Sequence, residues 1–178
     1  MTPELSVVVP VYNEQDALRD LDREIRAALQ ATGRSAEIIY VNDGSSDRTE
    51  AELLALMASR PWLRQIRHDR SCGQSAALRT GIAQARAPLV VTLDGDGQND
   101  PAFIPKLIEA FEAGQPRVGM VAGQRVGAEA RDAVRARVLG ERFEQQRAEP
   151  AAVVRVRDHE RDLGAVVGVE RFLAEIQV

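Results

Sequence analysis

The chain has 178 residues, of which 44% are hydrophobic and only 4% aromatic, and its formal net charge is −4 at pH 7. This length fits one domain with a substantial core, and the composition suits an α/β protein better than a β-sandwich. With a sequence pI near 5.3, the chain has no basic field to attract nucleic acid, which we do not expect as a partner.

Cysteine content and hydropathy indicate the cellular compartment in which the protein resides. The single cysteine, Cys72, excludes an internal disulfide framework, and we expect it to be a small, partly buried residue. No apolar run approaches the about 20 residues that cross a bilayer. Residues 1–5 also lack the charged start and apolar stretch of a signal peptide. The sequence therefore predicts a cytoplasmic protein.

Short β-branched runs alternate with amphipathic segments along the first half of the chain. The pattern predicts strands at 6–11, 37–41, 63–67 and 89–93, and helices at 15–32, 49–59 and 73–85. The run at 6–11 shows no polar alternation, which is typical of a strand buried on both faces of a parallel sheet. Strands and helices that alternate in this way require right-handed crossovers, so we expect an α/β fold with a mostly parallel sheet flanked by helices.

Polar clusters follow three of the predicted strands. They comprise residues 12–14, 42–47 and 94–100. In open α/β sheets the ligand binds beyond the carboxyl ends of the strands. We therefore expect these three loops to converge on one crevice.

The third cluster contains two carboxylates one residue apart. Asp94 and Asp96 follow the predicted strand at 89–93, and Gln98 comes two residues later. Their oxygens are the hard ligands that Mg²⁺ or Mn²⁺ prefers, and the intervening glycines allow a tight turn. The alternative is a solvated, glycine-rich turn in which Asp and Asn are favoured by turn geometry alone.

The sequence offers no other phosphate-binding motif. It contains no Gly-x-Gly-x-x-Gly after the first strand and no Gly-x-x-x-x-Gly-Lys-Ser/Thr. Neither a dinucleotide cofactor nor a Walker-type loop is therefore supported, and phosphate binding must depend on the metal. Asp43, which follows the second strand, can accept hydrogen bonds from a base or a ribose, so a nucleoside diphosphate would engage both sites.

Four segments together resemble the family 2 glycosyltransferases of the GT-A fold, and in particular the dolichyl- or polyprenyl-phosphate mannosyl- and glucosyltransferases. They are Val-Pro-Val-Tyr-Asn-Glu (9–14), Val-Asn-Asp-Gly-Ser-Ser-Asp-Arg-Thr (41–49), Gly-Gln-Ser-Ala-Ala-Leu-Arg-Thr-Gly (73–81) and Leu-Asp-Gly-Asp-Gly-Gln-Asn-Asp-Pro (93–101). Each segment is moderately specific, and their order and spacing are highly specific. The resemblance covers about residues 4–127.

The resemblance implies how the donor would be bound. The nucleoside would lie against Pro10, Tyr12 and Glu14, and Asp43 would read its base or ribose. Arg125, in a stretch that resembles the family's Gly-Ser-Arg, would lie near the phosphates. The donor would be a GDP- or UDP-linked sugar.

The resemblance also implies the chemistry. Asp94 and Asp96 match the metal-binding Asp-x-Asp motif, with Gln98 as a further ligand. The cation would stabilise the departing nucleoside diphosphate while an acceptor, a polyprenyl phosphate at the inner face of a membrane, attacks the sugar with inversion. A phosphate acceptor needs no dedicated base. We interpret His68 as a surface residue without a catalytic role.

The composition changes near residue 127. From Arg125 to Val178 there is no Ser, Thr, Asn, Lys, Tyr, Trp, Cys or Met, although residues 1–124 contain all eight types. Nearly all residues of this tail can be encoded by codons that begin with G or C, as a frame slip in a GC-rich gene would produce. We therefore predict a nucleotide-sugar-binding domain at 1–127 and an atypical tail at 128–178. The alternative is a genuine, divergent tail with a helix at 131–146.

Two other functions remain compatible with the residues. One is a catalytically incompetent remnant that binds the donor but lacks the acceptor half. The other is a metal-dependent nucleotidyltransferase, although its usual glycine-rich and basic phosphate loop is missing after the first strand. The sequence makes no prediction of an oligomeric state.

Overall fold

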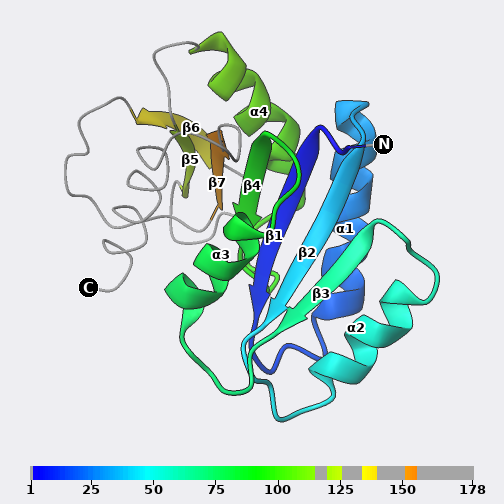
Figure 1. Ribbon diagram of the computed structural model, residues 1–178. Coiled ribbons are helices and arrows are strands. Elements are labelled where there is room, and N and C mark those ends of the chain that lie inside the picture. The colour runs from blue at the N-terminus through cyan, green and yellow to red at the C-terminus, as the bar shows by residue number, and fades with distance from the viewer. Residues whose placement is uncertain (1, 115–119, 126–133, 140–150, 156–178) are drawn as a thin grey trace.

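The computed structural model describes residues 2–114, 120–125, 134–139 and 151–155. Seven strands form one sheet in the order β3-β2-β1-β4-β7-β5-β6 (Figure 1). Their bounds are β1 Leu5–Val11, β2 Ala36–Asn42, β3 Leu63–Arg67, β4 Leu89–Leu93, β5 Met120–Arg125, β6 Val134–Leu139 and β7 Ala151–Arg155.

The first four strands are parallel, as the sequence predicts. Val8 of β1 pairs with Thr92 of β4, and Val11 pairs with Asn42 of β2, which in turn pairs with Arg67 of β3. The four strands therefore end together. We call this end of the sheet, with the loops that follow β1 to β4, the carboxyl edge; the opposite end is the amino edge.

In the described part of the chain, four α-helices cover the two faces of the sheet: α1 Leu18–Thr32, α2 Thr49–Met57, α3 Gln74–Ala83 and α4 Ile104–Ala113. Figure 1 shows α3 on one face, where it contacts β1 and β2, and α1 on the opposite face, where it contacts both α2 and α4. A short 3₁₀ helix, η1 (Pro101–Phe103), leads into α4. The fold is the expected α/β arrangement of a mostly parallel sheet between helices.

Hydrophobic periodicity explains these elements. All residues of β1 are buried, because both faces of this central strand are covered. In α1 the buried side chains recur at helical spacing along one face: Leu18, Leu21, Ile25, Ala28 and Leu29. The helix ends at Gly33, whose φ of 65° closes the last turn with its N–H donated to Gln30.

The far side of the sheet departs from the sequence expectations. The alternative of a helix at 131–146 is wrong over Val134–Leu139, where the chain forms β6. Its Val-Arg-Ala-Arg-Val sequence alternates apolar and polar residues, which is the period of a strand and not of a helix. The boundary at residue 127 and the frame slip stay predictions, because most of residues 128–178 lie outside the described part.

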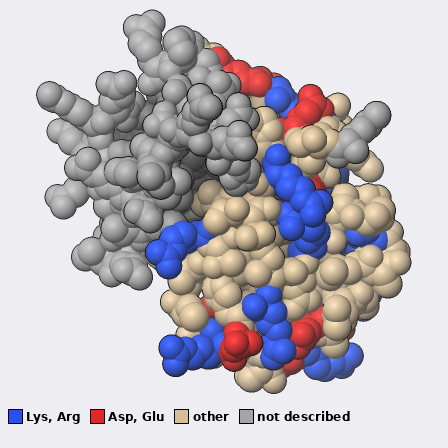
Figure 2. Space-filling view, in the orientation of Figure 1, with Lys and Arg blue, Asp and Glu red and all other residues tan. Residues whose placement is uncertain are grey.

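The described residues include no helix that combines the length and the apolar character needed to cross a membrane. Figure 2 shows acidic and basic side chains side by side along the lower edge of the molecule, below a largely uncharged surface. In this orientation the carboxyl ends of β1, β2 and β3 point toward that edge (Figure 1).

Candidate functional site

Hydrogen bonds join the loops that follow β1 and β2. The side-chain oxygen of Asn13 accepts the backbone N–H of Ser46 at 2.9 Å, and the Asn13 N–H donates to the Ser45 hydroxyl at 3.0 Å. The next N–H, that of Glu14, donates to the Thr49 hydroxyl at 2.9 Å. Asn13 has a φ of 57°, which asparagine tolerates better than most residues. The two loops therefore form one connected unit.

The carboxylate of Asp43 organises the neighbouring loop, residues 68–73. Its Oδ1 lies 2.6 Å from His68 Nδ1, and its Oδ2 accepts the Ser71 hydroxyl and the Gly73 N–H, both at 2.8 Å. The Cys72 N–H lies 2.9 Å from both oxygens. Burial raises the pKa of Asp43, but the hydrogen bonds led by Cys72 and His68 outweigh it and hold the pKa below its ordinary value.

Two expectations about this loop are corrected by the structure. His68 is not a surface residue: only 16% of its side chain is exposed, and Nε2 lies 3.0 Å from the Thr80 hydroxyl. It follows β3 directly, so the sheet places it between Asp43 and α3. Cys72 is exposed, not partly buried, because it lies in the loop that precedes α3.

Gly44 allows the loops after β2 and β3 to touch. Its φ is 71°, and a Cβ at this position would lie 2.5 Å from the carbonyl carbon of Arg70 and 2.7 Å from the nitrogen of Ser71. Any other residue would force these two loops apart. The loop after β3 is therefore fixed to the loop after β2 by backbone packing as well as by the hydrogen bonds of Asp43.

The carboxylate pair follows β4. Asp94 is half-buried, and its two oxygens accept the side-chain amides of Gln74 and Asn99. Asp96 is exposed and accepts the Gln98 N–H at 2.9 Å. The side chain of Gln98 is exposed too. Asp94 is thus oriented by two amides, while Asp96 projects toward solvent.

Gly95 packs this pair against the end of β1. A Cβ on Gly95 would lie 2.5 Å from the Pro10 carbonyl oxygen and 2.6 Å from a methyl carbon of Val11. Only glycine permits this approach. The buried Pro10 therefore supports the Asp-x-Asp turn from below, while the exposed Tyr12 lies two residues further along the same edge.

Negative charge accumulates where the loop after β1 approaches the loops after β2 and β4. The pKa of Glu14 is raised, first by burial and then by the charges of Asp96 and Asp47. The loop after β1 thus lies near the loop after β4, and adjacent residues connect the other two carboxylates, since the Gly73 N–H donates to Asp43 and the Gln74 amide donates to Asp94. A divalent cation would relieve this repulsion, and the all-oxygen donor set fits Mg²⁺ or Mn²⁺.

Arg125 is the last residue of β5, and its side chain lies outside the described part. The pairing of β7 with β4 and with β5 still fixes the position of its backbone. Ala152 of β7 pairs with both Thr92 of β4 and Ala122 of β5, and β5 runs in the direction of β4. Arg125 therefore lies at the carboxyl edge, two strands away from Asp94. Its role, like those of the other site residues, stays a prediction.

Sequence reasoning missed three residues that hold the site together. They are Asn13, which joins two loops, His68, which contacts Asp43, and Gln74, which donates to Asp94. Asn13 and Gln74 lie within the segments that carry the family resemblance, so their positions were a usable signal. For His68 the usable signal was its position directly after the predicted strand at 63–67.

The chain is similar to known proteins both in sequence and in fold. The sequence model described as glycosyl transferase family 2 matches residues 6–161, and so extends past residue 127. Over 119 residues the chain is 44% identical to an undecaprenyl-phosphate 4-deoxy-4-formamido-L-arabinose transferase of Edwardsiella ictaluri, covering 66% of this chain and 36% of that protein. The chain thus spans about a third of the length of this curated relative.

Two solved structures are similar in fold. A mannosyltransferase of Pyrobaculum calidifontis, in complex with GDP-Man and Mn²⁺, matches with a TM-score of 0.61 and 22% identity over 71% of this chain and 36% of that one. A glucosyl-3-phosphoglycerate synthase of Mycobacterium tuberculosis, with Mn²⁺, UDP and phosphoglyceric acid, matches with a TM-score of 0.55 and 23% identity over 67% and 42%. Both confirm the GT-A fold.

Proposed function

Because this chain belongs to glycosyl transferase family 2, we propose that its carboxyl edge binds a nucleotide-diphosphate sugar, which it donates to a polyprenyl phosphate. The observation that supports this most directly is the meeting of Glu14, Asp43 and the Asp94–Asp96 pair at one edge of the sheet. A base-reading carboxylate and a cation-binding pair are the two elements that a nucleoside diphosphate requires.

The nucleoside would lie against Pro10, Tyr12 and Glu14. Tyr12 is 50% exposed, so its ring is available to a ligand. Donors from residues 68–73 already surround both oxygens of Asp43, and a carboxylate offers about four acceptor positions. A base or ribose donor would therefore replace one of these internal hydrogen bonds, so that nucleoside binding and the loop arrangement are coupled.

The cation would be held by Asp94, Asp96 and Gln98, and would act as a Lewis acid on the departing diphosphate. The chain prepares this site in two ways. Gln74 and Asn99 fix the orientation of Asp94, and Gly95 fixes the turn against Pro10. The Mn²⁺ in both similar structures supports the choice of metal. Arg125 would lie at the same edge, near the phosphates.

The acceptor class rests on the relative that acts on undecaprenyl phosphate. A phosphate oxygen is already ionised near neutral pH, so it can attack the anomeric carbon without a general base. The expected outcome is inversion at that carbon. Since a polyprenyl chain resides in a bilayer, transfer would take place at a membrane surface.

Calorimetric titration with UDP, GDP and their sugar conjugates, with and without Mn²⁺, tests the donor site. We expect one nucleotide to bind in a Mn²⁺-dependent way and Asp96→Asn to weaken that binding at least tenfold, since it removes a charged metal ligand. Asp16→Asn, an exposed carboxylate of the neighbouring loop, is the matched control. Equal nucleotide affinity in both folded variants would contradict the proposed site.

A second candidate is a protein that binds the donor without transferring the sugar. Among the described residues, the side chains assigned to the site, including Asp43, Asp94 and Asp96, all serve the donor, and none is assigned to the acceptor. Incubation with undecaprenyl phosphate and the donor identified by calorimetry separates the two. Labelled sugar in the lipid fraction, lost in Asp96→Asn, supports transfer; Mn²⁺-dependent binding without lipid-linked sugar supports the second candidate.

A further inference from the structure

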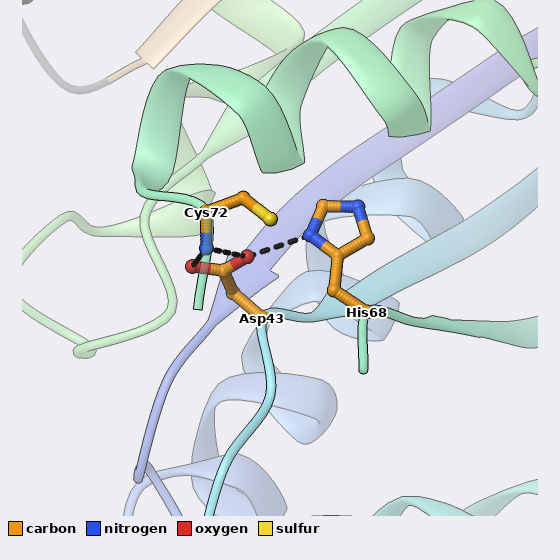
Figure 3. A group of neighbouring side chains, drawn as sticks. All are labelled: Asp43, His68 and Cys72. Carbon is orange, nitrogen blue, oxygen red and sulfur yellow. Dashed lines mark hydrogen bonds and ion pairs between the residues drawn. The ribbon is translucent and has the colours of Figure 1, made fainter. Parts of the chain in front are cut away.

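Asp43, His68 and Cys72 bring three different metal-ligand types together. Figure 3 shows the sulfur of Cys72 and the ring of His68 on the same side of the Asp43 carboxylate. One ligand atom from each residue lies within 4.8 Å of the other two. The Asp43 and His68 side chains are nearly buried, whereas Cys72 is exposed, so the group opens toward solvent through the cysteine.

We propose that these three residues form a binding site for a thiophilic divalent cation such as Zn²⁺, distinct from the carboxylate pair Asp94 and Asp96. The donor atoms are Asp43 Oδ1, His68 Nδ1 and Cys72 Sγ, with water as the fourth ligand. A thiolate and an imidazole favour Zn²⁺, whereas the oxygen set after β4 favours Mg²⁺ or Mn²⁺. Ligand softness therefore separates the two sites.

The surroundings already supply the hydrogen bonds that such ligands need. A histidine that binds metal through one nitrogen holds its other N–H on a hydrogen-bond partner, and His68 Nε2 lies 3.0 Å from the Thr80 hydroxyl. For Asp43, Oδ2 accepts the Ser71 hydroxyl and the Gly73 N–H, and the Cys72 N–H lies 2.9 Å from both oxygens. Oδ1 is the oxygen that faces His68 Nδ1, at 2.6 Å.

Binding exchanges a proton for the ion. In the absence of metal, the 2.6 Å contact between Asp43 Oδ1 and His68 Nδ1 is a hydrogen bond. The cation would bind the Nδ1 lone pair, and the single N–H of the neutral ring would move from Nδ1 to Nε2, where the Thr80 hydroxyl accepts it. The thiol of Cys72 would bind as a thiolate, so its proton leaves to solvent.

The geometric adjustment is modest. Bonds of about 2.0–2.3 Å to N, O and S place tetrahedral ligand atoms about 3.5 Å apart. The Asp43–His68 contact would open by about 1 Å, and the cysteine sulfur would move closer. Because the Cys72 side chain is exposed, its sulfur can move by side-chain rotation, while the backbone of the loop stays packed against Gly44 and hydrogen-bonded to Asp43.

Titration with Co²⁺, a spectroscopic stand-in for Zn²⁺, tests the site in the full chain without nucleotide, so its result is independent of the donor proposal. We expect a thiolate-to-cobalt charge-transfer band at one equivalent, with tetrahedral visible absorption, that Zn²⁺ abolishes. Cys72→Ser should remove the charge-transfer band. Since Cys72 is exposed, this variant should fold normally.

Three further variants locate the site. His68→Gln should weaken Zn²⁺ binding at least tenfold, and Thr80→Val about tenfold, since outer-shell partners contribute 10–100-fold in affinity. Asp96→Asn should leave the charge-transfer band unchanged. Absence of the band in the wild-type chain, its persistence in Cys72→Ser, or its loss in Asp96→Asn would overturn the proposal.

Discussion

The two ends of strand β2 each carry a buried carboxylate, and they differ in what surrounds it. At the amino edge, Glu37 accepts the Ser6 hydroxyl at 2.8 Å and the Arg86 N–H at 2.7 Å, and pairs with Arg64 through two 3.0 Å contacts. At the carboxyl edge, Asp43 is no more exposed, yet no arginine or lysine of the described residues forms an ion pair with it.

The surroundings of these two carboxylates suit different roles, stability of the fold for Glu37 and ligand binding for Asp43. The charge of Glu37 is matched by the Arg64 guanidinium, two nitrogens of which contact Oε2, so this carboxylate is satisfied inside the protein. Asp43 is surrounded by backbone N–H groups, a hydroxyl and an imidazole that belong to one exposed loop. Its hydrogen bonds can therefore be exchanged for those of a ligand, whereas those of Glu37 cannot be exchanged without unfolding the amino edge.

The largest effect is expected at the amino edge. Glu37→Ala leaves Arg64, Ser6 and the Arg86 N–H without their common partner, which should lower the free energy of unfolding by about 3 kcal/mol. Urea denaturation followed by circular dichroism measures it. The matched control is Glu50→Ala, which breaks an exposed 3.6 Å pair with Arg67 and should cost less than about 1 kcal/mol.

Glu37→Ala also tests whether nucleotide binding at the carboxyl edge is independent of the amino edge. Under conditions where Glu37→Ala remains folded, it should bind nucleotide and Mn²⁺ as the wild-type chain does, since its effect is on stability. A folded Glu37→Ala protein that has lost nucleotide binding would show that the two edges are coupled.

An intermediate effect is expected at the carboxyl edge. Gly33 and Gly44 have nearly the same positive φ, 65° and 71°, but a Cβ would meet nothing within 4 Å at Gly33 and the backbone of Arg70 at 2.5 Å at Gly44. Gly33→Ala should therefore cost about 1 kcal/mol, the penalty of the left-handed conformation alone.

Gly44→Ala should cost about 1 kcal/mol more, about 2 kcal/mol in total, because two backbone segments must separate. Thermal and urea unfolding of the two variants give the difference directly. In contrast to Glu37→Ala, Gly44→Ala should also weaken nucleotide binding, since it moves the loop that holds Asp43. Equal costs for the two glycines would show that the loops part freely.

The smallest effect is expected at the middle of β2. Asp22 of α1 is fully buried near Tyr40, with Arg60 at 3.2 Å, and burial raises its pKa more than Arg60 and Arg26 lower it. The folded pKa thus exceeds the unfolded one. Stability from this group is present below the ordinary pKa of about 3.9 and is lost as pH rises through the folded value.

Asp22→Asn replaces the titratable carboxyl group of Asp22 with an amide that does not ionise. The free energy of unfolding of the variant relative to wild type should therefore increase between pH 3.5 and 7, by at most about 1 kcal/mol. Urea unfolding across this range measures the trend, with the exposed Asp20→Asn of the same helix as the control for loss of charge. A difference that decreases with pH would mean that the attraction of Arg60 exceeds the cost of burial.

The sequence was most informative where one physical pattern dominated. Mainly apolar runs located β1, β2 and β4, and the alternation of strands and helices predicted the parallel order of β1 to β4, which placed Asp43 and Asp94 at one edge. The contacts of His68 were not predictable, because they depend on the register between β2 and β3. The strand at Val134–Leu139 was missed although its alternation was visible, and α4 although Ile104, Leu107, Ile108 and Phe111 have helical spacing.

The antiparallel strand β7 has a consequence for how the chain is made. Leu93, at the end of β4, pairs with Ala151, so β4 lacks its second neighbour until translation has passed residue 151. Until then a strand that is fully buried in the folded protein has an open edge, on which another chain could pair. Such long-range closure slows folding. The fold is therefore most vulnerable to aggregation on the ribosome, before its last described strand has emerged.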